Sequence, residues 1–150
     1  MRKVLISALV TALVAGLSPL PVFAGDTVQS GQGATFVSVS PVEAKELIET
    51  REGLQLVDVR TRQEYSGGAL PGSALVTYNS WSPKSFLKDM QGFDRKRPVL
   101  LVCAVGGRSW AAASLLSRNG FTEIYNLNGG LQAWQQQRVP LPAGTPAAVR

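Results

Sequence analysis

The chain contains no histidine among its 150 residues. Without an imidazole the chain cannot form a Ser-His-Asp triad or a Cys-His catalytic pair of its own. The same absence argues against a zinc site, whose usual protein ligands are histidine and cysteine. We therefore expect no metal site, and chemistry that activates its nucleophile without histidine.

Cysteine occurs only once, as Cys103, so the chain cannot form an internal disulfide bond. Proteins of oxidising compartments usually hold their cysteines in pairs. A single one in such a protein indicates either a bridge to another molecule or a free reactive thiol. Which compartment the protein occupies is therefore the next question.

The N-terminus answers that question. Arg2 and Lys3 are followed by a nearly unbroken apolar run over residues 4–17, then by Pro19, Pro21 and Ala24. This order predicts a secretory signal peptide over residues 1–24 with cleavage after Ala24. The alternative is a retained membrane anchor, but the apolar run is shorter than the roughly 20 residues that span a bilayer. We expect a periplasmic protein without stable membrane insertion, with secretion as the alternative.

Positive charge is also limited in the predicted mature chain. Loss of Arg2 and Lys3 from the 15 basic residues leaves 13 against 10 acidic ones, a net charge of +3. The basic residues are scattered apart from the run at residues 95–97, and no aromatic residues lie between them. This pattern does not favour nucleic-acid binding. Nothing in the chain requires more than a monomer.

The mature chain divides into three segments. Residues 25–34 are polar and rich in glycine, which predicts a flexible N-terminus. Residues 35–138 have the length and apolar content of one globular domain. Residues 139–150 contain three prolines and form the predicted C-terminal tail.

Strand and helix patterns alternate through the domain. Ser40, Pro41 and Glu43 form a capping box with proline at the first helical position. Further helices are expected at 61–68, 83–90, 108–118 and 131–137, and strands at 35–39, 54–60, 74–76, 98–103 and 123–127. The alternation predicts an α/β fold with a central five-stranded, mostly parallel sheet and helices on both faces.

Cys103 lies where a predicted central strand ends and a helix begins. Gly106 and Gly107 allow successive main-chain N–H groups to point inward, and the following helix adds the positive end of its dipole. A thiol in such a loop ionises more readily, with Arg108 nearby as a further positive charge. The alternative is a buried structural cysteine at the end of a core strand.

Three segments of the chain together resemble the rhodanese-like domain family. The first comprises Asp58-Val59-Arg60, Glu64-Tyr65 and residues 68–74, and the second is the Cys103 loop. The third runs from Gly120-Phe121 to Gly129-Gly130-Leu131-Gln132-Ala133-Trp134. Each motif alone is weak, but their order and spacing from about residue 39 to 134 make a specific signal.

The resemblance implies sulfur transfer through a persulfide on Cys103. Thiosulfate or a similar small anion would be the donor, and cyanide, a small thiol or a protein thiol the acceptor. No cofactor is implied. The substrate-binding residues would be those of the loop itself: Ala104, Val105, Gly106, Gly107, Arg108 and Ser109.

Two features of the loop refine this expectation. Four residues separate Cys103 from Arg108, and cysteine phosphatases of related fold use a longer loop to hold phosphate. Outside the loop, Ala69 replaces a common histidine, and we expect this change to have a small effect. Within the loop, Ala104 and Val105 are apolar where efficient thiosulfate enzymes often carry charge. The expected activity is thus slow with thiosulfate, or directed at a less polar donor or a protein persulfide.

Other roles for the same loop stay open at this point. The domain could be a non-catalytic module that binds an anion or a partner protein, or a thiol relay that acts on another protein. Asp58 and Arg60 are expected to organise the sheet edge near the loop through hydrogen bonds, with a contact of Arg60 to the substrate as the alternative. Glu64 is expected to pair with a nearby basic side chain or to cap main-chain N–H groups. Trp134 and Phe121 are expected in the core, whereas Trp81 and Trp110 could line the pocket mouth or pack internally.

Overall fold

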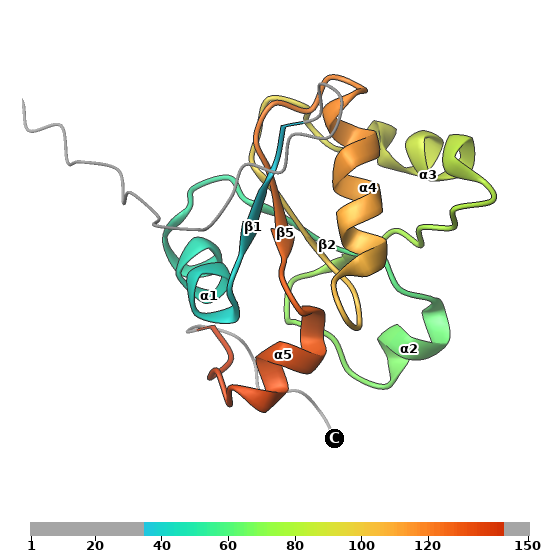
Figure 1. The fold of residues 1–150 in the computed structure, drawn as a ribbon. Helices are drawn as coiled ribbons and strands as arrows, with labels where there is room; N and C mark the ends of the chain where they lie inside the picture. The colour runs from blue at the N-terminus through green and yellow to red at the C-terminus, as the bar shows by residue number, and fades with distance from the viewer. Residues whose placement is uncertain (1–34, 143–150) are drawn as a thin grey trace, which may run out of the picture.

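The computed structural model describes residues 35–142 and contains one five-stranded parallel sheet in the order β1-β5-β4-β2-β3. The predicted α/β fold is confirmed. Figure 1 shows the sheet with its helices. The strands are β1 (Val37–Val39), β2 (Gln55–Asp58), β3 (Ala74–Leu75), β4 (Val99–Val102) and β5 (Ile124–Leu127).

Helices cover both faces of the sheet, as the alternating pattern predicts (Figure 1). Two apolar clusters lie on either side of the strands, one under α3 and α4 and the other under α1 and α5. The helices are α1 (Pro41–Thr50), α2 (Arg62–Ser66), α3 (Pro83–Asp89), the short 3-10 helix η1 (Met90–Gly92), α4 (Gly107–Ser117) and α5 (Gly130–Gln136).

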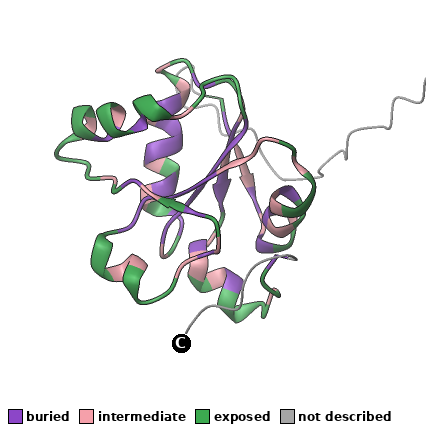
Figure 2. Cartoon of the chain, turned by 180° about the vertical axis from the view of Figure 1, so that it is seen from behind, coloured by how far each residue is buried: buried purple, intermediate pink, exposed green. Residues whose placement is uncertain are grey.

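Strand β4 is the centre of the sheet and is buried along its whole length (Figure 2). Val99 and Leu101 belong to the cluster under α3 and α4, whereas Leu100 and Val102 belong to the cluster under α1 and α5. This alternation is typical of a strand with both faces covered. It explains why its sequence is continuously apolar.

Several elements are shorter than their sequence patterns. The strand expected at 54–60 ends at Asp58, because the Asp58 carboxylate accepts the main-chain N–H of Arg60 in place of a neighbouring strand.

The capping box of α1 is confirmed: Ser40 N–H donates to Glu43 at 2.8 Å, and Glu43 N–H donates to Ser40 Oγ at 3.3 Å.

The expected signal peptide, flexible N-terminus and most of the tail lie outside the described residues. The start of the tail contacts the domain, since Val139 N–H donates to Trp134 O and the Val139 side chain packs on the cluster under α1 and α5. Within residues 35–142 no helix has the length and apolar character to cross a membrane.

Candidate active site

Cys103 directly follows β4, at the carboxyl edge of the parallel sheet. This is the edge where sheets of this kind place their ligands. Its side chain is fully covered, with 0% exposure. The sulfur accepts the main-chain N–H of Gly106 at 3.1 Å and lies 3.3 Å from Ser109 Oγ. The loop therefore wraps around the thiol and aims its donors at the sulfur.

The surroundings of Cys103 lower the pKa of its thiol. Burial alone raises the pKa, because it disfavours the charged form. The hydroxyl of Ser109 and the main-chain N–H groups of Ser109, Val105 and Gly106 together outweigh burial. Hydrogen bonds to the thiolate thus favour the charged form of the thiol without any histidine.

Arg108 points its guanidinium at Glu64 of α2. Arg108 Nη1 donates to Glu64 Oε2 at 2.8 Å, and Nη2 donates to Oε1 at 2.5 Å. This two-pronged contact holds the pKa of Glu64 well below its usual range and raises that of Arg108. The same carboxylate accepts the main-chain N–H of Thr61 and closes the capping box of α2. Glu64 thus connects α2 to the first turn of α4 and neutralises the loop's cation.

The first turn of α5 holds the loop in place through main-chain hydrogen bonds. Leu131 N–H donates to Cys103 O at 2.9 Å, and Gln132 N–H donates to Ala104 O at 3.0 Å. Gly130 has a φ of +60°, and a Cβ there would lie 2.5 Å from Cys103 O. Only glycine allows this approach. Sequence reasoning identified Gly130 as part of a family motif and missed this contact, although two consecutive glycines before a helix are a visible signal.

The predicted site residues take different places in the loop. Cys103, Gly106 and Ser109 converge and are buried. Val105 is 61% exposed at the rim, Gly107 is exposed beside it, and Ala104 is half-buried. Ser109, which was expected to bind the substrate, is buried, and its hydroxyl contacts the sulfur of Cys103.

Asp58 and Arg60 form a buried ion pair at the end of β2. Arg60 Nη2 lies 2.8 Å from Asp58 Oδ2 and donates to Gly68 O at 2.6 Å. The pair organises this edge of the sheet, as expected. Phe121 and Trp134 lie in the core, also as expected.

The two remaining tryptophans differ in their surroundings. Trp110 is partly exposed and packs edge-to-face on Phe36, with ring centroids 5.6 Å apart. Trp81 is 93% exposed. It lines a hollow of about 410 Å³ beside the Cys103 loop, together with Gly107 and Arg108.

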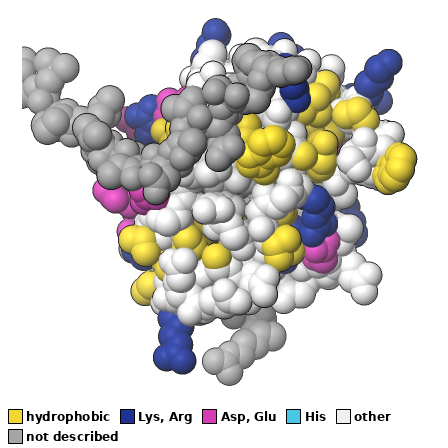
Figure 3. Space-filling view, in the orientation of Figure 1, with side chains coloured by type: hydrophobic (Ala, Val, Ile, Leu, Met, Phe, Trp, Pro, Cys, Tyr) yellow, Lys and Arg dark blue, Asp and Glu magenta, His cyan; other side chains and the backbone are white. Residues whose placement is uncertain are grey.

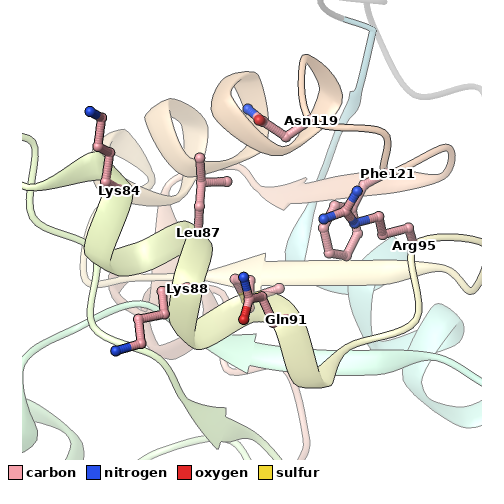
Figure 4. Close-up of a pocket in the computed structure, with 8 residues that line it drawn as sticks. Lys84, Leu87, Lys88, Gln91, Arg95, Asn119 and Phe121 are labelled. Carbon is pink, nitrogen blue, oxygen red and sulfur yellow. The ribbon is translucent and has the colours of Figure 1, made fainter.

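A second hollow, of about 230 Å³, lies at the far end of α4 (Figure 4). Lys84, Lys88 and Arg95 stand around it over an apolar floor, and Figure 4 shows both lysines extending away from its centre. Its lining has no thiol, hydroxyl or carboxylate side chain. The thiol of Cys103, with its surrounding hydrogen-bond donors, therefore makes the loop after β4 the stronger candidate active site. No cluster of metal-ligating side chains occurs in the described part of the chain.

Curated proteins with similar sequences are named as sulfurtransferases. Among curated relatives, thiosulfate sulfurtransferase GlpE of Pseudomonas paraeruginosa is 32% identical over 101 residues, which cover 67% of this chain and 86% of that protein. GlpE of Actinobacillus pleuropneumoniae is 32% identical over 107 residues, covering 71% of this chain and 94% of that protein.

Solved structures show the same fold. A rhodanese-like domain protein from Staphylococcus aureus has 27% identity and a TM-score of 0.57, covering 73% of this chain and 95% of that one. The polysulfide-sulfur transferase homodimer of Wolinella succinogenes has 27% identity and a TM-score of 0.56, covering 70% of this chain and 77% of that one.

The family model of the rhodanese-like domain matches residues 40–137. This range contains α1, the Asp58–Arg60 pair, the Cys103 loop and α5. The chain belongs to the rhodanese-like domain family.

Proposed function

We propose that this protein is a sulfurtransferase that carries the transferred sulfur as a persulfide on Cys103. The observation that carries the proposal is the sulfur of the chain's only cysteine, which accepts hydrogen bonds from Gly106 N–H and Ser109 Oγ at the carboxyl edge of the sheet. The names of the GlpE relatives and of the Wolinella structure support the same reaction class.

In the first step the Cys103 thiolate attacks the outer sulfur of the donor. With thiosulfate, an S–S bond forms to Cys103 while the S–S bond of the donor breaks, and sulfite leaves with the electron pair. Main-chain N–H groups that stabilise the thiolate also stabilise the terminal sulfur of the persulfide, which carries the negative charge after transfer.

In the second step a thiophilic acceptor attacks that terminal sulfur. Cyanide becomes thiocyanate, or a thiolate becomes a persulfide, and the Cys103 thiolate leaves with the electrons of the broken S–S bond. Both steps are displacements at sulfur, so no net oxidant or reductant is consumed. Neither step requires a cofactor.

Access to the sulfur requires movement of the loop, because Cys103 has 0% exposure. Val105 and Gly107 are the exposed residues of the loop, and a glycine at 107 favours a change of backbone conformation there. We include this opening in the proposal as the step that admits the donor.

The test measures thiocyanate formation from thiosulfate and cyanide. Cys103→Ser should reduce the rate to the uncatalysed background, because a hydroxyl at this position forms no persulfide. Ser85→Ala, an exposed position on α3, serves as control and should keep the wild-type rate. Turnover by Cys103→Ser would overturn the proposal, whereas binding without turnover in the wild type would favour a binding module.

We propose further that the protein acts in the periplasm after removal of residues 1–24. The basic start, apolar run and Ala24 support this placement. Mass spectrometry of the protein from the periplasmic fraction of a bacterial host should give a chain that begins at Gly25. A chain that retains Met1 in the membrane fraction would overturn this assignment.

A further inference from the structure

The hollow beside the Cys103 loop offers a neutral, aromatic surface rather than a positive one. It is lined by Gly107, Arg108 and Ala111 of α4 and by Thr61, Tyr78 and Trp81 from neighbouring segments. Arg108 is the one charged side chain among its lining residues. Figure 3 shows hydrophobic side chains gathered on this side of the molecule over α4. The electrostatics of the hollow therefore depend on Arg108.

Glu64 pairs with Arg108 and so reduces the positive charge that the hollow offers. The two side chains form two parallel hydrogen bonds of 2.8 and 2.5 Å, and both are about one-third exposed. A carboxylate bound in this way leaves the guanidinium little capacity to hold a second anion. A doubly charged donor such as thiosulfate would have to give up water here without a counter-charge, which is costly.

Trp81 provides an apolar surface in the same hollow. Its side chain is 93% exposed, so the fold itself gains little from the indole. An apolar group placed in the hollow would bury part of the indole surface, and each Å² of apolar surface removed from water contributes about 25 cal/mol.

We propose that the preferred sulfur donor has an apolar carrier group and at most one negative charge, with Glu64 as the positioning residue that neutralises Arg108 and Trp81 as the surface that receives the carrier. This inference rests on the proposed function. It replaces thiosulfate by organic thiosulfonates and persulfides as the favoured donor class.

A matched donor pair tests the charge and the carrier together. Benzenethiosulfonate and thiosulfate both present an outer sulfur on a sulfonyl sulfur, but the first has one negative charge and a phenyl ring. Attack by the Cys103 thiolate forms the same persulfide and releases benzenesulfinate or sulfite. Wild-type protein should show a kcat/KM at least about tenfold higher for benzenethiosulfonate.

Glu64→Gln tests the role of the carboxylate. Glutamine retains an oxygen for the Thr61 N–H, so the capping box can persist. Freeing the Arg108 charge should shift the ratio of the two kcat/KM values about threefold toward thiosulfate at low salt, and salt should reduce the shift. Glu123→Gln is the control, because Glu123 forms a similar two-pronged pair with Arg51 at 2.9 and 2.7 Å. Its donor ratio should remain at the wild-type value.

A double variant separates charge from structure. Glu64→Gln combined with Arg108→Gln restores a neutral pair and should return the donor ratio to the wild-type value. Arg108→Gln alone leaves an unpaired carboxylate and should disfavour thiosulfate further. A ratio that does not follow the net charge of these two positions would overturn the role of Glu64.

Trp81→Ala tests the carrier surface, with Val42→Ala as the control because Val42 is an exposed apolar residue on α1. Loss of the indole should reduce kcat/KM for benzenethiosulfonate about fivefold and leave thiosulfate unchanged. Equal activity of wild type with both donors and an unchanged ratio in Glu64→Gln would overturn this inference while leaving sulfur transfer intact. Failure of both donors to place sulfur on Cys103 would overturn the proposed function itself.

Discussion

The main-chain N–H of Leu131 donates to the carbonyl oxygen of Cys103 at 2.9 Å, so the start of α5 holds the residue that carries the thiol. The contact is possible because Gly130 presents no side chain to the loop. The shape of the active-site loop therefore depends on a segment far from it in the sequence.

Gly130→Ala should disrupt this support. Its φ is +60°, and the new Cβ would lie 2.5 Å from Cys103 O and 2.6 Å from Ala104 O. Left-handed backbone at a non-glycine residue costs about 1–2 kcal/mol, and the contact with the loop adds to this. We expect a loss of about 3 kcal/mol or more in the free energy of unfolding, with sulfur transfer reduced at least about tenfold.

Gly72→Ala is the matched control for Gly130→Ala. Gly72 has a φ of +78°, but a Cβ there meets no atom within 4 Å. The Gly72→Ala variant should lose only the free energy of unfolding that the left-handed backbone costs, about 1–2 kcal/mol, and should keep its activity. Equal effects of the two substitutions in urea unfolding and turnover assays would contradict the proposed contact.

Ser109→Ala should raise the pKa of the Cys103 thiol. The Ser109 hydroxyl favours the thiolate, and its loss leaves the opposing effect of burial less compensated. The pH midpoint of Cys103 alkylation by iodoacetamide should move upward. A hydrogen bond to a charged group contributes about 1.5–3 kcal/mol, so the rate of sulfur transfer at neutral pH should fall by about tenfold or more.

The same substitution changes how stability depends on pH. Because the folded-state pKa of the thiol is lowered, its contribution to stability is full above the unfolded pKa and is lost as pH falls through the folded value. Ser109→Ala should reduce this contribution.

Ser114→Ala is the control for both measurements, because Ser114 is a buried serine of α4 that is bonded to Arg118. An unchanged alkylation midpoint in Ser109→Ala would rule out the hydroxyl as an activating group.

Asp58→Asn should destabilise the domain strongly. It leaves the buried guanidinium of Arg60 without its counter-charge, and breaking such a pair costs about 3–5 kcal/mol. Glu123→Gln removes one partner of the more exposed pair with Arg51 and should cost about 1 kcal/mol or less. Urea midpoints of the two variants measure the difference, and similar values would show that burial does not distinguish the pairs.

Glu64 should remain ionised in mildly acidic solution. Hydrogen bonds from Arg108 and Thr61 hold its pKa well below the usual range. The pair's contribution to stability is therefore present above the ordinary glutamate pKa and is lost only as pH falls through the lowered folded value. NMR of the Glu64 carboxyl carbon should show no titration near pH about 4.3, the ordinary value. The Arg108→Gln variant should restore a midpoint closer to that value.

Local sequence signals predicted most of the fold. Ser40 and Glu43 marked the start of α1, and the apolar run before Cys103 marked the central strand, because both depend on neighbouring residues. The predicted ends of elements were less accurate. The end of β2, for example, depends on the Asp58 side chain, which accepts the main-chain N–H of Arg60.

The site was predictable only in part. The position of the thiol and the direction of its pKa shift followed from the glycine loop and its place before a helix. The pairing of Glu64 with Arg108 and the contact of Gly130 with Cys103 join segments distant in the sequence. Arg108 was expected near the thiol and Glu64 was expected to pair with a basic side chain, but nothing in the local pattern indicated that these two residues would bind each other.

The most direct test of the central claim is intact-protein mass spectrometry of the chain after incubation with a sulfur donor. Thiosulfate and benzenethiosulfonate are each applied, and the protein is measured before and after the addition of cyanide. The proposed function predicts the gain of one sulfur atom, its removal by cyanide, and no gain in Cys103→Ser. Absence of any gain with both donors, in protein whose Cys103 is shown to be a free thiol, would contradict it.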